Sequence, residues 1–342
     1  MKRTITEAFK VVDNQCLIID GYGYFLGKNS NRIVVKQNEK TVSQIPFDDI
    51  NCIILSSRSA FLSTAFINEA CRHGVGIVIW GNGSPNILVA SSRLSAFVEA
   101  KRAQFDAYKN VKGLNLVKKV IASKIANQTA LIRYYSKNTN KRAYFEKASR
   151  SLNLNVQNVK NIDGDNISAV RNSILMLEAI SSKIYWKCFI ELMHYDLNFS
   201  GRDTEGVDAV NAALSYGYAI LYSLTWMAIL NAGLEPFAGF LHTDRPGKPS
   251  LVFDLSEPFK QRLVDRPIMS LINNRQLIRS VGALLDTRSK KLISTKIMNE
   301  LYKKENYCGR KLSLISIIQS NIYSTVSELK DTGQYNEYKF KW

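Results

Sequence analysis

The stretch AVNAALSYGYAILYSLTWMAILNAGL, residues 209–234, contains no charged side chain. It is long enough to cross a bilayer, yet it carries a polar side chain every few positions, among them Asn211, Ser215 and Thr225. Such groups are costly in hydrocarbon but are easily paired inside a protein. A glycine and then a proline follow its last helical residues, as at a helix end. The stretch therefore predicts the buried central helix of a soluble domain and argues against a membrane protein.

The segments around this helix predict an α+β chain with two domains. Short β-branched runs alternate with turn signals in the first ninety or so residues. The expected strands are residues 16–19, 32–35, 52–55, 76–80 and 87–90. A helix is expected at 63–73, and GNGSPN at 81–86 is expected to form a tight turn. Beyond that, apolar residues recur with helical spacing, so we expect a small β-rich domain at 1–92 and a larger all-α domain at 93–342.

The charge balance points to a polyanionic partner. The chain has 342 residues, and its 46 Lys and Arg against 29 Asp and Glu give a formal net charge of +17. The basic residues are spread along the chain, which indicates a basic folded surface for nucleic acid or an acidic membrane surface. The alternative is a charged surface that serves solubility alone.

The cysteines and the N-terminus favour a cytoplasmic location. The five cysteines contain no CxxC pair, which argues against a structural zinc site. An odd number of cysteines fits a reducing compartment. The first ten residues, MKRTITEAFK, have no apolar segment of the kind that directs export.

The segment GFLHTDRPGKPSLVFDLSEPFK, residues 239–260, carries the first candidates for chemistry. It places His242 a short loop away from Asp254 and Glu257. An imidazole and two carboxylates on short tethers can hold a divalent cation. The alternative is a solvated acidic face or an acidic first helical turn, and Pro258 leaves the local backbone open.

The same segment contains a basic, turn-rich loop. Arg245 and Lys248 lie in it and could bind a phosphate beside such a cation. His73 and His194 are interpreted as structural or surface residues. The chain has no GxSxG or Walker sequence.

Glu178 is a second unusual carboxylate. It lies in a strongly apolar helical pattern at 174–189, and none of its neighbours three or four positions away is cationic. Such a carboxylate needs a compensating partner. The partner is either a cation from another helix, such as Arg202, or a metal; the alternatives are a long-range salt bridge or an exposed position.

Four ordered blocks of this chain resemble motifs of the CRISPR-associated integrase family, the larger of the two core proteins of CRISPR adaptation. The blocks are EAISSKIYW (178–186), DAVNAALSYGYAIL (208–221), AGLEPFAGFLH (232–242) and GKPSLVFDLSE (247–257). The resemblance covers nearly the whole chain. One departure is RDTEGVD (202–208), where family members often have paired prolines.

The resemblance implies a β-rich N-terminal domain, a helical C-terminal domain and a homodimer. It also implies a complex in which two such dimers clasp a dimer of the small second adaptation protein. The expected substrate is short double-stranded DNA, whose 3′-hydroxyl ends are joined into a CRISPR repeat. The alternative is a catalytically inactive DNA-binding scaffold of the same family.

The resemblance further implies that Glu178, His242 and Glu257 are the metal ligands. Asp254 matches an acidic position of the motif and is placed beside or just outside the ligand shell. This mostly oxygen donor set favours Mg²⁺ or Mn²⁺. Lys248 and Arg245 are expected to stabilise phosphate charge during transesterification or hydrolysis of DNA.

Overall fold

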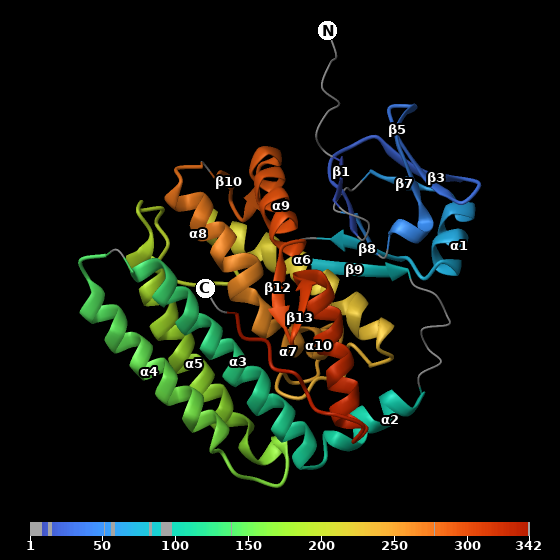
Figure 1. The fold of residues 1–342 in the computed structure, drawn as a ribbon. Helices are drawn as coiled ribbons and strands as arrows, with labels where there is room; N and C mark the ends of the chain where they lie inside the picture. The colour runs from blue at the N-terminus through green and yellow to red at the C-terminus, as the bar shows by residue number, and fades with distance from the viewer. Residues whose placement is uncertain are drawn as a thin grey trace. The chain divides into compact units, whose positions relative to one another are not determined.

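The structure is a computed structural model. It describes residues 9–12, 16–50, 52–55, 59–81, 84–89, 98–137, 139–276 and 278–340. The chain divides into two compact units, Met1–Ala96 and Phe97–Trp342, which are described separately (Figure 1). The expected domain boundary at residue 92 lies outside the described residues.

The N-terminal unit contains two sheets and a short helix. The five-stranded sheet has the order β1 (Phe9–Val12), β2 (Cys16–Ile19), β6 (Cys52–Leu55), β8 (Gly76–Gly81) and β9 (Ser84–Val89). Its central pairs, β2 with β6 and β6 with β8, are parallel. The four-stranded sheet has the order β5 (Lys40–Pro46), β4 (Arg32–Gln37), β3 (Tyr24–Asn29) and β7 (Phe61–Leu62). The 3-10 helix η1 (Phe47–Asp49) and the helix α1 (Thr64–Arg72) complete the described part of this unit.

The β-branched runs at residues 16–19 and 52–55 form buried strands. All four residues of β2 and of β6 are buried, as continuous apolar runs in parallel strands usually are. The predicted helix is also confirmed: the Ser63 side chain caps its start. Its end is marked by Gly74 with φ +70°. One detail was wrong, because residues 84–86, predicted as part of a turn, belong to strand β9.

The C-terminal unit is built mainly of helices. They are α2 (Val98–Ala107), α3 (Val111–Ser136), α4 (Arg142–Lys160), α5 (Ile167–Leu192), α6 (Ala209–Asn231), α7 (Ser250–Ser256), α8 (Arg266–Asn273), α9 (Thr287–Leu301) and α10 (Leu314–Leu329). Helices α3, α4 and α5 run side by side, as Figure 1 shows in green. The strand-rich first part and the helical second part confirm the predicted fold class.

Two short hairpins interrupt the helices, which the expectation of an all-α domain did not include. They pair β10 (Ser280–Val281) with β11 (Leu284–Leu285) and β12 (Lys304–Tyr307) with β13 (Arg310–Ser313). Strands of two to four residues are too short to show an alternating pattern in the sequence.

The uncharged helix α6 lies in the core of this unit. Its apolar window is long enough for a membrane span, but 72% of that window is buried inside the protein. The Asp208 side chain caps it by accepting from the amides of Val210 and Asn211. Burial of its small and polar residues explains why the helix carries no charge.

The chain from α7 to α8 is a nearly continuous helical rod despite Pro258. After α7 it passes through a 3-10 turn, η3 (Glu257–Phe259), and a π-helical turn, η4 (Gln261–Asp265), before α8 begins. The side-chain amide of Asn127 donates to the carbonyl of Pro258 at 2.7 Å. This rod places Asp254, Glu257 and Asp265 in the interior, where each is less than 5% exposed.

Asp265 is held by two tyrosines. The hydroxyls of Tyr185 and Tyr218 donate to its two carboxylate oxygens at 2.7 Å and 2.6 Å. Burial raises the pKa of Asp265 to about 6 from the usual 3.8, although the tyrosine hydrogen bonds lower it. The folded chain therefore keeps this proton at pH values where the unfolded chain has lost it.

Asp265→Asn should change the pH dependence of stability. Between about pH 4 and pH 6 the folded wild type binds more protons at this carboxyl than the unfolded chain does. The unfolding free energy of wild type relative to Asp265→Asn should therefore fall by roughly 3 kcal/mol as pH rises through that window, from the two-unit shift. Urea unfolding at several pH values measures it, and a difference that stays constant or rises would contradict the account.

Candidate active site

The partner of Glu178 is a lysine from a neighbouring helix. Lys124 on α3 places its ammonium against Glu178 Oε1 of α5 and 2.8 Å from Glu257 Oε2 of η3. The Lys124 side chain is only 10% exposed. Of the alternatives for Glu178, a cation from another helix is confirmed. It is Lys124 and not the example Arg202, whose guanidinium donates to Asn211 Oδ1 and Ser215 Oγ. Two carboxylates from distant parts of the chain thus converge on one cation.

Glu257 has a second lysine partner. Lys260 donates to Glu257 Oε1 at 2.8 Å, and its ammonium lies 5.1 Å and 5.5 Å from the ring centroids of Tyr218 and Tyr222. Burial would raise the pKa of Glu257, but the charges of Lys124 and Lys260 hold it well below its usual range. Glu257 is therefore ionised despite being almost fully buried.

Asp254 orients His242. One carboxylate oxygen accepts from the amides of Phe240 and Leu241 at 2.7 Å and 3.0 Å. The other accepts from the His242 amide at 3.1 Å and from His242 Nδ1 at 2.5 Å. Since a carboxylate can only accept, Nδ1 carries the proton and the Nε2 lone pair of the neutral ring stays available. Both oxygens of Asp254 are engaged, so this residue positions the imidazole.

His242 lies at the edge of this cluster. Its side chain is 39% exposed, whereas that of Asp254 is 4% exposed. Burial lowers the pKa of His242, but the hydrogen bond to Asp254 and the charges of Asp254 and Glu257 outweigh burial, so the pKa is raised overall.

The carboxylates of Glu178 and Glu257 and the imidazole of His242 fit a divalent cation only in part. Glu178 and Glu257 already share one cationic group, which shows that their oxygens can face a common positive charge. In the described part of the chain, no three His, Cys, Asp or Glu side chains converge closely enough to hold a metal ion. The Lys124 ammonium stands between the two carboxylates, so a divalent cation could take that position only after the lysine withdraws.

The two basic loop residues lie on a β-turn. The Lys248 amide donates to the Arg245 carbonyl at 3.0 Å, and Pro246 and Gly247 occupy the turn between them. Gly247 is the third residue of this turn, and its φ of +76° is the positive value that a type II turn has at that position. Both basic side chains are exposed, and neither forms an ion pair with a described residue. They are therefore free to contact an anion.

A family model described as CRISPR associated protein Cas1 matches residues 17–298. The chain belongs to the Cas1 family. The resemblance seen in the four sequence blocks is thereby confirmed. A curated relative, CRISPR-associated endonuclease Cas1 1 of Archaeoglobus fulgidus, is 30% identical over 344 residues, which cover 95% of this chain and 99% of the relative.

Solved structures share the Cas1 fold. A casposase bound to integration product matches with a TM-score of 0.81 and 22% identity, covering 96% of this chain and 94% of that one. A Cas6-RT-Cas1–Cas2 complex matches with a TM-score of 0.79 and 17% identity, covering 100% of this chain and 38% of that one. At these identities the likeness extends to the fold alone.

Sequence reasoning missed two cationic residues of this Cas1 site. Lys260 had a local signal, since it follows Glu257 by three positions and can face it on a helix. Lys124 had a weaker signal: Val120, Ile121, Asn127 and Gln128, its neighbours at three and four positions, offer no carboxylate. A lysine and a glutamate that both lack local partners on apolar helices are candidates for pairing with each other.

Lys124→Met should strongly destabilise this Cas1 chain when divalent cations are absent. Removing the shared ammonium leaves two carboxylates facing each other in a largely buried place, which costs about 3–5 kcal/mol. The control is Lys119→Met on the same helix, because Lys119 pairs with Glu328 at 2.6 Å and is 34% exposed. That variant should lose about 1 kcal/mol or less. Chemical unfolding in EDTA measures the unfolding free energy of both variants. Equal losses would contradict the larger contribution to stability that is expected of Lys124.

Proposed function

We propose that this chain is a metal-dependent DNA integrase and endonuclease of CRISPR adaptation. Membership of the Cas1 family supports the general role, as does the relative named as an endonuclease. The observation that carries the catalytic part is the convergence of Glu178 and Glu257 on the Lys124 ammonium, together with the orientation of His242 by Asp254. Such a group of carboxylates and imidazole is a recurrent arrangement for holding a catalytic divalent cation.

The proposed cofactor is Mg²⁺ or Mn²⁺, held by Glu178, Glu257 and His242. When bound, it would stabilise the charge that develops on a DNA phosphate and activate the attacking hydroxyl or water. Lys124 has to leave the space between the two carboxylates, and its displaced ammonium then remains a nearby cation. Asp254 keeps His242 in the tautomer whose Nε2 can serve as a ligand.

The proposed reaction is a transesterification. The 3′-hydroxyl oxygen of the incoming DNA forms a P–O bond, the P–O bond to the existing 3′ oxygen breaks, and the proton lost by the attacking hydroxyl is gained overall by the leaving oxygen. One phosphodiester replaces another, so no ATP is required. With water as the attacking group, the same side chains would support DNA cleavage.

Lys260 and the basic turn are proposed to interact with DNA charge. Lys260 donates to Glu257 Oε1, and its positive charge is proposed to favour the approach of the reacting phosphate. Arg245 and Lys248 are exposed and are assigned to the phosphates of double-stranded DNA next to it. The net charge of +17 implies that duplex affinity falls steeply with salt.

The proposed assembly is a homodimer that uses the β-rich N-terminal unit and binds the small second adaptation protein, Cas2. The likeness to a chain of a Cas1–Cas2 complex supports the second partner, and the likeness to a casposase bound to integration product supports DNA. The proposed location is the cytoplasm. A catalytically inactive DNA-binding scaffold is the alternative, and the retained pair Glu178 and Glu257 argues against it.

Glu178→Gln should separate catalysis from DNA binding. The neutral amide weakens cation binding, so joining and cleavage of DNA in Mg²⁺ or Mn²⁺ should fall by about 100-fold or more. Duplex affinity should stay within a few fold, because Glu178 faces Lys124 and not the basic turn. The control is Glu191→Gln on the same helix, whose partner Lys141 is more than half exposed, and this variant should join DNA normally.

A loss of duplex affinity is expected instead for Arg245→Gln combined with Lys248→Gln. This variant should lose duplex affinity and should show a shallower salt dependence, by about two phosphate contacts, while thermal stability stays unchanged. Joining of DNA at the wild-type rate by Glu178→Gln would contradict the catalytic proposal. A wild-type protein that binds duplex DNA but neither joins nor cleaves it with either cation would establish the scaffold instead.

A further inference from the structure

We propose that Asn127 and Tyr338 are positioning residues for Glu257: together they fix the 3-10 turn η3, whose first residue is Glu257, against α3. Tyr338 lies in the C-terminal segment 335–340, which follows α10 and is neither helix nor strand. In Figure 1 this segment is the last stretch of red, and it runs from the end of α10 to α3. The inference rests on the proposed role of Glu257 as a metal ligand.

The C-terminal segment is part of the core of the helical unit. Tyr335, Tyr338 and Phe340 are only 4%, 2% and 6% exposed. The last residues of a chain are ordered only where packing and hydrogen bonds hold them. The contacts of this segment therefore show which part of the unit it supports.

Asn127 of α3 joins the segment to the turn that carries Glu257. Its side-chain amide donates to the carbonyls of Tyr338 and Pro258, at 3.0 Å and 2.7 Å. Its side-chain oxygen accepts from the amide of Phe340 at 3.3 Å. Asn127 is fully buried, and a buried amide of this kind holds its partners firmly because water cannot replace them. One side chain thus connects α3, the turn and the C-terminal segment.

The Tyr338 ring packs directly on the same turn. Its centroid lies 4.8 Å from that of Phe259, and the two ring planes differ by 24°. Phe259 is fully buried and follows Glu257 by two positions. Stacked rings at this distance attract each other, so a shift of the turn would break a favourable contact.

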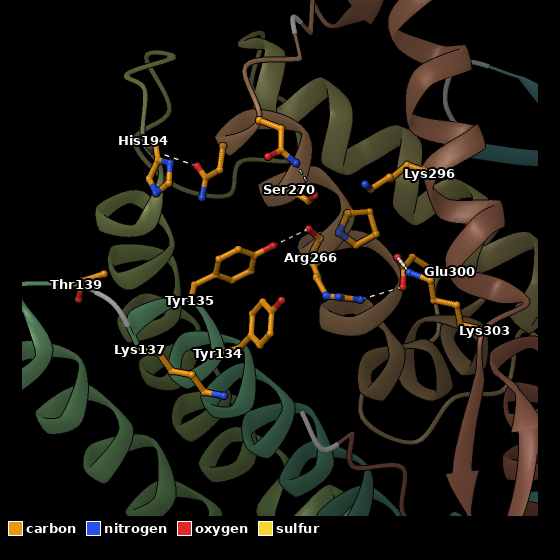
Figure 2. A pocket seen from close by; sticks show the side chains of 13 residues that line it. Tyr134, Tyr135, Lys137, Thr139, His194, Arg266, Ser270, Lys296, Glu300 and Lys303 are labelled. Atoms are coloured by element: carbon orange, nitrogen blue, oxygen red, sulfur yellow. Dashed lines mark hydrogen bonds and ion pairs between the residues drawn. The ribbon is translucent and has the colours of Figure 1, made fainter.

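The Tyr338 hydroxyl is anchored in a network of buried charges. It donates to Glu305 Oε2 at 2.9 Å, and Glu305 Oε1 lies 2.6 Å from Arg262 Nη2. Arg262 also pairs with Glu300 at 2.5 Å, and Glu300 accepts from Arg266 at 2.9 Å (Figure 2). Both arginines lie on the helical rod that continues from the turn. The network therefore limits rotation of the Tyr338 ring away from the turn.

These contacts become important when Lys124 withdraws. Lys124 also ties the turn to α3, through its ion pair with Glu257 at 2.8 Å, and it lies on the same face of α3 as Asn127, three positions later. The proposed cation can bind only after that ion pair is lost. The Asn127 bond to Pro258 and the stacking of Tyr338 do not involve the carboxylate, so they persist. They keep Glu257 in place, which metal binding needs because ligands have to be held to within about 0.5 Å.

The test compares Mn²⁺ binding by Tyr338→Leu and by Tyr335→Leu, read from the loss of the electron paramagnetic resonance signal of free Mn²⁺. Tyr335 is the matched control: it is a buried tyrosine of the same segment, and its hydroxyl donates to Asn321 Oδ1 of α10 at 3.3 Å. Both variants should lose a similar free energy of unfolding. Only Tyr338→Leu should weaken Mn²⁺ binding, by about tenfold, the low end of the effect of residues that support a metal ligand.

Equal Mn²⁺ affinities of the two variants would overturn the positioning role. Tyr338→Phe keeps the ring on Phe259 and should restore Mn²⁺ binding, and a loss as large as that of Tyr338→Leu would contradict the stack as the cause. Asn127→Ser removes the side-chain amide and should also weaken binding by about tenfold. This smaller change keeps the test decisive if Tyr338→Leu does not fold.

Failure of the proposed function would give a different result. In that case the wild type would bind no Mn²⁺ that Glu178→Gln removes. Failure of the positioning role alone would leave that wild-type binding intact and would change it equally, or not at all, in the two tyrosine variants.

Discussion

The helical unit depends on the two ion pairs that the Lys124 ammonium forms with Glu178 and Glu257. This ammonium joins α3, α5 and the 3-10 turn after α7, which are far apart in the sequence. Lys260 adds a second positive charge on the other side of Glu257. Charges this buried are tolerated only when they are paired and well placed, so the three helical segments are fixed relative to one another by the same groups that are proposed to bind the catalytic cation.

The rest of the unit serves to keep that cluster in place. The uncharged α6 fills the core, and the rod from α7 to α8 sets the spacing between Asp254, Glu257 and Asp265. Gly239 permits the close approach that Asp254 needs, since a Cβ there would lie 2.5 Å from Ser250 Cβ and 3.1 Å from Asp254 Oδ2. Asp254 can thus accept from three backbone amides and from the imidazole, which fixes the orientation of His242.

Local patterns predicted the local parts of this structure. The buried strands, the core helix α6 and the nearness of His242 to Asp254 all follow from residues close together in the sequence. The partner of Glu178 could not be found that way, because Lys124 lies 54 positions earlier and only the packing of α3 on α5 brings the two together. Pro258 likewise left the local backbone open, and the structure continues it through 3-10 and π-helical turns. The short hairpins carried no periodic signal.

The central claim is that the position of the Lys124 ammonium is also the position of the catalytic cation. Crystals of the wild-type chain soaked in Mn²⁺ test it most directly, because the anomalous scattering of manganese locates the ion independently of activity. The account predicts an anomalous peak between the Glu178 and Glu257 carboxylates, with His242 turned toward it and the Lys124 side chain withdrawn. A peak elsewhere, or no peak while Lys124 keeps both carboxylates at a saturating Mn²⁺ concentration, would contradict it.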